Sequence, residues 1–261
     1  MKKAVLTLSL GLSLTLVPSL SYAQDTSPKQ APQIEILPKA DKKFIKKNSK
    51  PAVVEADTTA KILNENGKVI GKKSFKSNKK SVNTEMKSLA ATRTVTVLAV
   101  ADEEYRAKYS DWQSRIQNII ERADNAFNRD HAIDFQVKAI AQWSSQGGSS
   151  SQILQDVGRD FDGYGYDFVA GFTGDRNFTA GGIAYVYNSA PSGSALSVNL
   201  DQGSATSSAA QHEFSHNFGL PHDAQGSGIR CIMNYDYSYS VDYWDAEHDA
   251  EIEQHEYWYG N

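Results

Sequence analysis

The spacing of apolar and polar positions predicts alternating strands and helices from about residue 94 onward. Residues 94–101 (TVTVLAVA) are β-branched and apolar throughout, which predicts a buried strand. In residues 103–128 apolar side chains recur every three or four positions, which is typical of an amphipathic helix. Similar runs predict four more strands, at residues 133–143, 167–172, 182–187 and 195–200. Because helical segments separate several strands, we expect an α/β (α+β) fold with a mostly parallel sheet.

Three further helices are predicted in this region. One follows the Ser/Gly loop 144–151 and runs to about residue 161. Residues 204–218 suit a second helix, with Ser204 as its N-cap. Residues 243–257 form a third, amphipathic segment, in which His248 and His255 are expected to be solvated.

The first 23 residues have the pattern of a secretory signal peptide. Lys2 and Lys3 precede an apolar run at residues 4–17, and the small-residue triplet ending at Ala23 marks the expected cleavage site. A membrane anchor is the alternative, but the run of 14 residues is shorter than the roughly 20 that span a bilayer. We therefore expect a secreted, extracellular protein without a membrane association.

Charge divides the remaining chain into two parts. Overall composition is ordinary for a globular protein, with 40% hydrophobic residues, and the single cysteine excludes an intramolecular disulfide. Residues 24–93 carry 16 Lys+Arg against 7 Asp+Glu, a net charge of +9, whereas residues 94–261 carry 9 against 24, a net charge of -15. This step predicts a basic propeptide that docks on an acidic domain. A nucleic-acid-binding arm or a disordered tail would have similar composition.

The chemistry is concentrated between residues 212 and 223. On the predicted helix, His212 and His216 lie one turn apart on the same face, so both imidazoles can reach one metal ion. Glu213 lies beside them, placed to contact a water on the metal. Gly219 can end the helix with a sharp turn that returns His222 as a third ligand. Three protein ligands and an open position are expected of a catalytic zinc ion.

This stretch resembles the extended zinc-binding consensus of the metzincin endopeptidases. Asp223, directly after the third histidine, is similar to the adamalysin-like variant, and residues 231–235 (CIMNY) resemble the Met-turn beneath the metal. The resemblance implies that Met233 supports the site and that Tyr235, as in astacins, is an additional contact. It also implies a C-terminal helix and an edge strand at Gly182, Ile183 and Ala184, over which substrate lies antiparallel.

Two features depart from the adamalysin pattern. Cys231 has no partner for a disulfide, and residues 24–93 contain no cysteine that could block zinc. Either a carboxylate such as Glu55, Asp57 or Glu65 binds the metal in the latent form, or the segment covers the cleft. Residues 160–163 (DFDG) hint at calcium but lack the remaining loop ligands, so calcium is unsupported.

These observations predict a monomeric zinc endopeptidase, made as a prepro-enzyme, that cleaves proteins or peptides with Glu213 as general base. Its own propeptide is the expected inhibitor, and no nucleic-acid partner is expected. A gluzincin with Glu247 as the third ligand is one alternative. A secreted zinc-binding module without activity is another, although it would have no use for Glu213. A nucleic-acid-binding arm at residues 42–80 is the third, and would persist in the mature protein.

The mature protein should begin between Ser88 and Thr94, just ahead of the first predicted strand of the catalytic domain. The reason is that the charge step and the change from lysine-rich to β-branched sequence coincide there. N-terminal sequencing of the secreted form measures this directly. A mature form that retains residues 42–80 would contradict the propeptide assignment and favour the nucleic-acid arm.

Overall fold

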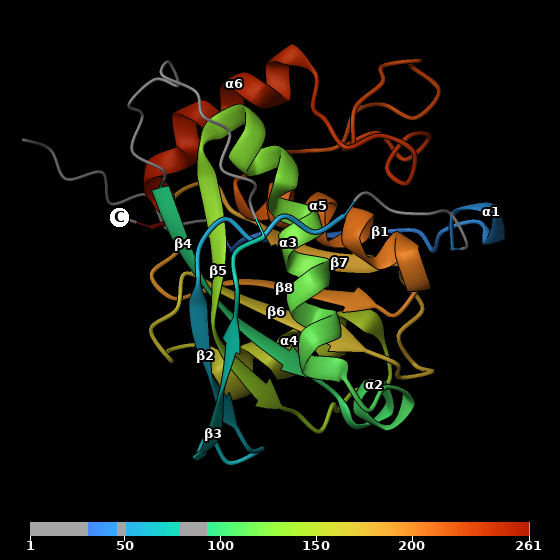
Figure 1. The fold of residues 1–261 in the computed structure, drawn as a ribbon. Coiled ribbons are helices and arrows are strands. Elements are labelled where there is room, and N and C mark those ends of the chain that lie inside the picture. The colour runs from blue at the N-terminus through green and yellow to red at the C-terminus, as the bar shows by residue number, and fades with distance from the viewer. Residues whose placement is uncertain (1–30, 46–50, 79–92, 261) are drawn as a thin grey trace, which may run out of the picture. The chain divides into compact units, whose positions relative to one another are not determined.

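One eight-stranded sheet organises the part of the chain that the computed structural model describes, residues 31–45, 51–78 and 93–260 (Figure 1). Its spatial order is β1-β7-β8-β6-β4-β5-β2-β3. The bounds of the strands are β1 Gln33–Leu37, β2 Thr58–Leu63, β3 Val69–Phe75, β4 Arg93–Ala101, β5 Ile133–Gln142, β6 Phe168–Thr173, β7 Gly182–Val186 and β8 Ala195–Leu200. Among the described residues no helix combines the length and the apolar character that crossing a bilayer requires.

The strand directions confirm the predicted α/β class. Strands β8, β6, β4, β5 and β2 are parallel to one another, and β7 joins β8 in the antiparallel direction. Strands β1 and β3 extend the two ends of the sheet, again antiparallel. The result is a mostly parallel sheet with an antiparallel strand beside β8, as a metzincin-type catalytic domain requires.

The predicted helix at residues 103–128 is two helices. The helices of the described chain are α1 Lys42–Ile45, α2 Glu103–Lys108, α3 Trp112–His131, α4 Ser150–Phe161, α5 Thr206–Asn217 and α6 Ala246–His255, with 3-10 turns η1 Gly203–Ala205 and η2 Glu256–Trp258. Tyr109 adopts an extended conformation between α2 and α3, and its hydroxyl donates to Asp201 Oδ2 at 2.8 Å. The apolar periodicity does not register this break, because both helices bury their apolar faces against the same core.

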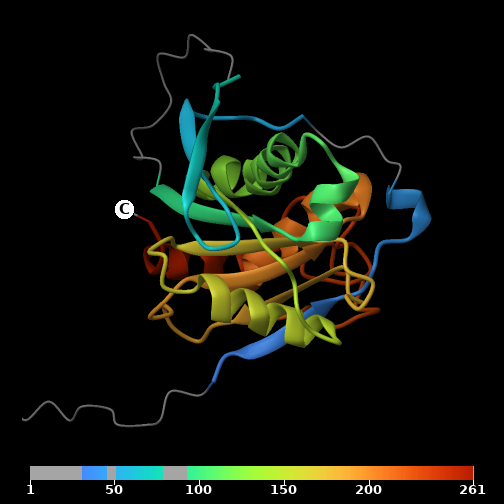
Figure 2. The same ribbon diagram turned by 90° about the horizontal axis from the view of Figure 1, so that it is seen from below.

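Helices cover both faces of the sheet (Figure 2). Helices α3 and α5 share one face with a cluster of aromatic rings, in which Phe135 of β5 stacks on Phe214 of α5 with 5.1 Å between ring centroids. Helix α4 packs on the other face, where Leu154 and Val157 share a buried cluster with Val198 of β8. Helix α5 packs against β7, β8 and α3, and nearly every one of its side chains is buried.

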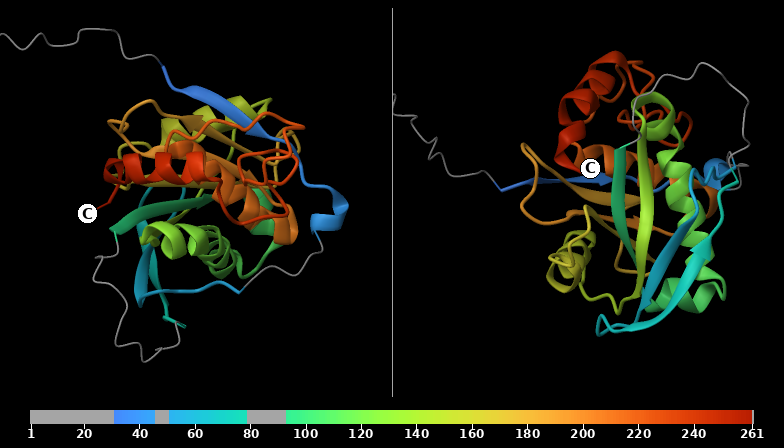
Figure 3. Two further views of the ribbon diagram at one scale, coloured as in Figure 1. Left: turned by 90° about the horizontal axis from the view of Figure 1, so that it is seen from above. Right: turned by 60° about the vertical axis from the view of Figure 1, so that its left-hand side comes forward.

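Strands of the predicted propeptide belong to the same sheet as the predicted catalytic domain. Strand β1 pairs with β7 at one end, and the hairpin of β2 and β3 adds to β5 at the other (Figure 3). The proposed signal peptide and most of the expected processing region lie outside the described residues. The boundaries at residues 23 and 93 therefore stay predictions.

Candidate active site

Helix α5 is fixed at both ends by hydrogen bonds to distant segments. It begins at Thr206 after η1, so Ser204 is not its N-cap as predicted; the Ser204 hydroxyl is directed to the carbonyls of Phe44 at 3.0 Å and Ile45 at 2.9 Å. At the other end the Asn217 amide donates to the carbonyls of Tyr185 at 2.9 Å and Leu196 at 3.1 Å. The Asn217 contacts hold the end of the helix against β7 and β8, and the Ser204 contacts tie the turn before the helix to Phe44 and Ile45.

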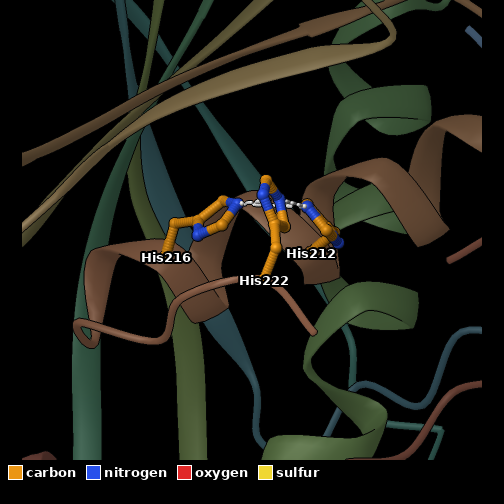
Figure 4. Close-up of side chains that lie close together, drawn as sticks. All are labelled: His212, His216 and His222. Atoms are coloured by element: carbon orange, nitrogen blue, oxygen red, sulfur yellow. Dashed lines mark hydrogen bonds between the residues drawn. The ribbon is translucent and has the colours of Figure 1, made fainter. Parts of the chain in front are cut away.

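Three histidine rings converge at the C-terminal half of α5 (Figure 4). His212 and His216 project from one face of the helix, and His222 arrives from the loop that follows. Their Nε2 atoms are separated by 3.0 Å (His212 to His222), 3.1 Å (His212 to His216) and 2.8 Å (His216 to His222). Gly219 makes the return possible, because its φ of +96° is a conformation that side chains other than glycine rarely adopt.

The outer ring nitrogens fix the direction of these rings. Nδ1 of His212 donates to the Ile232 carbonyl at 2.7 Å, and Nδ1 of His216 donates to the Leu220 carbonyl at 2.7 Å. A neutral imidazole that donates through Nδ1 keeps a lone pair on Nε2. Burial lowers the pKa of His212 to about 3 and that of His222 to about 4, which favours the neutral ligand form.

The residues present fit a zinc ion. Tetrahedral zinc with bonds of about 2.0–2.1 Å to nitrogen places its ligand atoms about 3.3 Å apart. The three Nε2 atoms lie slightly closer together than this, at 2.8–3.1 Å. The backbone carbonyls on Nδ1 are the outer partners that orient metal-binding histidines. His212, His216 and His222 could therefore hold the metal, as the sequence predicts.

Glu213 is the buried carboxylate beside the histidines. Its side chain is fully buried, and neither Oε1 nor Oε2 has a hydrogen-bond partner among the described residues. Burial, followed by the charge of Glu35, raises the pKa of Glu213 well above its ordinary value. The carboxylate lies against β7, since a Cβ built on Gly182 would be 2.3 Å from Glu213 Oε1.

The turn at residues 231–234 contains the methionine that the resemblance places beneath the metal. Met233 is fully buried, and the turn closes with a hydrogen bond from the Asn234 amide to the Cys231 carbonyl at 3.1 Å. The Ile232 carbonyl within this turn is the one that orients His212. Asp223 links the turn to the histidine loop, because its amide donates to the Met233 carbonyl at 3.3 Å.

Tyr235 lies over the third histidine. Its ring centroid is 4.3 Å from that of His222, and its hydroxyl donates to the carbonyl of Ile36 at 2.8 Å. Burial, with the charges of Glu35 and Glu213, raises the pKa of Tyr235 to about 12, so the phenol remains protonated and able to donate. The hydroxyl thus contacts a peptide carbonyl next to the histidines.

Strand β1 lies on the edge strand that the resemblance assigns to substrate. It runs antiparallel to β7, in a register that pairs Leu37 with Gly182, Ile36 with Ile183 and Glu35 with Ala184. Leu37 is 1% exposed, whereas its neighbour Ile36 is 44% exposed. Beyond the strand, the Gly181 amide donates to the Leu37 carbonyl at 2.7 Å and the Tyr239 hydroxyl donates to the Pro38 carbonyl at 2.6 Å.

The carboxylate that reaches the histidines is Glu35, which the sequence analysis missed. Its Oε2 lies 3.3 Å from Nδ1 of His222. Two of the carboxylates considered from sequence have other partners: Asp57 pairs with Lys76 and Glu65 pairs with Arg106, each at 2.7 Å. The signal for Glu35 was the strand-like run Gln33–Leu37 ahead of the lysine-rich stretch, which local pattern alone did not connect with the active site.

Other residues singled out from sequence lie apart from the three histidines. Glu247, the alternative third ligand, is exposed in the first turn of α6. Asp160 pairs with Arg159 at 3.0 Å, and Asp162 Oδ1 accepts from the Ser194 amide at 2.8 Å. The prediction that His248 is solvated is wrong, because its side chain is only 5% exposed.

Comparison with known proteins identifies the class. Residues 91–245, more than half of the chain, match metallo-peptidase family M12, and the chain belongs to this family. This is a family of metallopeptidases, and the match agrees with the metzincin resemblance of the sequence. No match was found among curated proteins. Among solved structures, one described as a chaperone-substrate complex shares 13% identity at a TM-score of 0.49; the alignment covers 80% of this chain and 42% of that one.

The contact between Gly182 and Glu213 predicts the effect of one added methyl group. Gly182→Ala should lower kcat by at least tenfold, because the new Cβ would lie 2.3 Å from Glu213 Oε1 and must displace the carboxylate. Metal content should not change, since the histidines are untouched. Gly148→Ala is the matched control, as its Cβ would meet nothing closer than 3.4 Å. Steady-state kinetics with metal analysis tests this, and unchanged kinetics in Gly182→Ala would show that Glu213 can move without consequence.

Proposed function

We propose that the chain is the secreted precursor of a monomeric metalloendopeptidase that cleaves proteins or peptides at the three-histidine site. The observation that carries the proposal is the convergence of three lone-pair nitrogens within 3.1 Å, beside a buried carboxylate that has no hydrogen-bond partner among the described residues and lies against β7. The pattern of residues 1–23 supports export. Membership of metallo-peptidase family M12 supports the hydrolysis of peptide bonds as the reaction.

The proposed mechanism divides the work between the histidines, Glu213 and β7. His212, His216 and His222 would hold zinc, which when bound would act as a Lewis acid that lowers the pKa of a water molecule to about 7 and polarises a carbonyl. Glu213 accepts the proton of the attacking water and then gives it to the leaving amine. Strand β7 aligns the substrate backbone by adding a strand to the sheet.

Tyr235 is the proposed donor to the developing oxyanion. Its hydroxyl already donates to the Ile36 carbonyl at 2.8 Å, which shows that the side chain reaches a peptide carbonyl of a strand lying on β7. A donor placed where negative charge develops stabilises the transition state more than the ground state. The same hydroxyl would serve a substrate carbonyl once β1 has left.

Glu213→Ala should abolish most of the proteolysis and leave metal binding intact. General acid–base catalysis contributes about 10²–10⁴-fold, so kcat/KM should fall by that range. Casein hydrolysis with and without a chelator, together with metal analysis, measures both properties. Glu247→Ala, at an exposed glutamate of α6, is the control and should retain activity and metal. Metal loss in Glu213→Ala, or hydrolysis that persists in chelator, would overturn the assignment.

Tyr235→Phe should lower kcat with little change in KM. It preserves the ring over His222 and removes one hydrogen bond to charge, worth about 1.5–3 kcal/mol, or about 10- to 150-fold in rate. Tyr237→Phe is a control, because the structure gives its hydroxyl no hydrogen bond in the described region. Initial rates across substrate concentrations separate the two parameters. An unchanged kcat would limit Tyr235 to packing.

We further propose that β1 keeps the precursor inactive by occupying the substrate position. Leu37 is buried against the edge strand, Glu35 contacts His222, and Tyr235 is engaged by Ile36. Strand β1 also affects Glu213, because one of the two causes of its raised pKa is the charge of Glu35 on β1. Loss of β1 would return Glu213 toward the carboxylate form that a general base needs.

The described contacts of the propeptide depend little on its positive charge. Two ion pairs cross between its described residues and the catalytic domain, Glu65 with Arg106 and Glu35 with His222, and in both the propeptide supplies the acid. The β-ladder and the buried Leu37 supply the rest at this site. The opposite net charges of residues 24–93 and 94–261 would therefore attract the two parts over a long range, while short-range contacts would produce the inhibition.

Leu37→Asp should give the uncleaved precursor at least tenfold more activity than wild type. A carboxylate at this buried position costs several kcal/mol if left unpaired, so β1 should leave the cleft. Ile36→Asp, one residue earlier on the same strand but 44% exposed, is the matched control and should stay latent. Initial rates on a short peptide, with chain integrity checked by mass spectrometry, test this. Equal latency in both variants would contradict the proposed role of β1.

A further inference from the structure

A second cluster of ligand-type side chains lies beside the loop that carries His222. It consists of Asp223, Cys231, Asp245 and His248, and one ligand atom from each lies within 4.8 Å of every other. Asp223 follows His222, Cys231 belongs to the turn of Met233, and the other two begin α6. Three separate segments therefore meet at this point.

His248 directs one ring nitrogen, Nδ1, into the cluster. Its Nε2 lies 3.1 Å from the Pro221 carbonyl, which can only accept, so Nε2 carries the proton. Nδ1 faces three groups that are acceptors or weak donors: Asp245 Oδ2 at 3.0 Å, Cys231 Sγ at 3.4 Å and Asp223 Oδ2 at 3.9 Å. Donation of Nε2–H to a backbone carbonyl is the outer contact common among metal-binding histidines.

Hydrogen bonds within the described residues do not satisfy every polar atom of this cluster. Asp245 Oδ1 already accepts from the amides of Glu247 at 2.9 Å and His248 at 3.0 Å as the cap of α6. The Asp223 side chain is only 10% exposed, and among the described residues its Oδ2, which is directed into the cluster, has no hydrogen-bond partner. A proton on Nδ1 of His248 could form a hydrogen bond to Asp245. It could not form one to Asp223, because Oδ2 of Asp223 lies 3.9 Å from Nδ1.

We propose that Asp223, Cys231, Asp245 and His248 form a second, structural site for a divalent transition-metal ion such as zinc. Ligand bonds of about 2.0–2.3 Å in tetrahedral geometry place ligand atoms about 3.3–3.8 Å apart. The separations of 3.0, 3.4 and 3.9 Å from Nδ1 bracket this range. A thiolate with an imidazole selects zinc or cobalt over calcium or magnesium.

The donor set also defines the role of the ion. Four protein ligands close the coordination shell, which is typical of structural zinc, whereas the three-histidine site keeps one position open. On binding, the Cys231 thiol releases its proton to solvent, and the two carboxylates with the thiolate outweigh the 2+ charge by one. The ion would fasten the His222 loop and the turn of Met233 to the start of α6.

Metal content and cobalt absorption of the full-length chain test this proposal. The chain is prepared in the Glu213→Ala background to prevent self-digestion and freed of unbound metal by gel filtration. Two zinc ions per chain are expected. Cobalt substitution should give a thiolate-to-cobalt charge-transfer band in the near ultraviolet, which three histidines cannot produce and which requires the single cysteine.

Two variants separate the sites. Cys231→Ser should lose one metal ion and the charge-transfer band, whereas His216→Gln should lose the other ion and keep the band. The band thus reports the second site even if the catalytic assignment fails. If Cys231→Ser does not fold, His248→Gln serves, with cobalt affinity read from the band weakened at least tenfold. Absence of the charge-transfer band from the cobalt-loaded Glu213→Ala chain, whether it binds one metal ion or two, would overturn the proposal.

Discussion

The crowding of three neutral imidazoles into one small buried volume is the constraint on which the site depends. Lone pairs on nitrogens about 3 Å apart repel, and burial prevents the rings from relieving this by taking up protons. The backbone resists that repulsion, because the carbonyls of Ile232 and Leu220 hold the outer nitrogens. The turn and the helix end thereby support the proposed metal site, where a bound zinc ion would replace the repulsion between lone pairs with three bonds.

The parts that could be predicted from sequence are those whose geometry is local. Spacing of four residues on a helix places His212 and His216 together whatever surrounds them. A glycine at 219 permits the turn that returns His222, and its positive φ of +96° confirms the prediction of a sharp helix end. The strands from residue 94 onward follow from apolar runs that needed burial, so a mostly parallel sheet was predictable as well.

The parts that sequence did not reveal depend on contacts between distant segments. Gln33–Leu37 pairs with residues about 150 positions further along, and a five-residue strand carries no local signal of its partner. His248 lies in a helix rich in charged residues, yet its ring is buried because α6 begins beside the Pro221 carbonyl. The break at Tyr109 follows from the reach of its hydroxyl to Asp201, which no periodicity records.

The attachment of β1 to the same chain as β7 has a consequence for how the proposed latency ends. A tethered strand meets its groove at an effective concentration of the order of millimolar, which even a weak ladder can exploit. A cut between β3 and β4 would leave the ladder intact and remove the tether. From that moment the inhibitor is a separate molecule, and the fraction of blocked enzyme falls as the mixture is diluted. The onset of activity would then depend on how far the cleaved protein is diluted as well as on the cut itself.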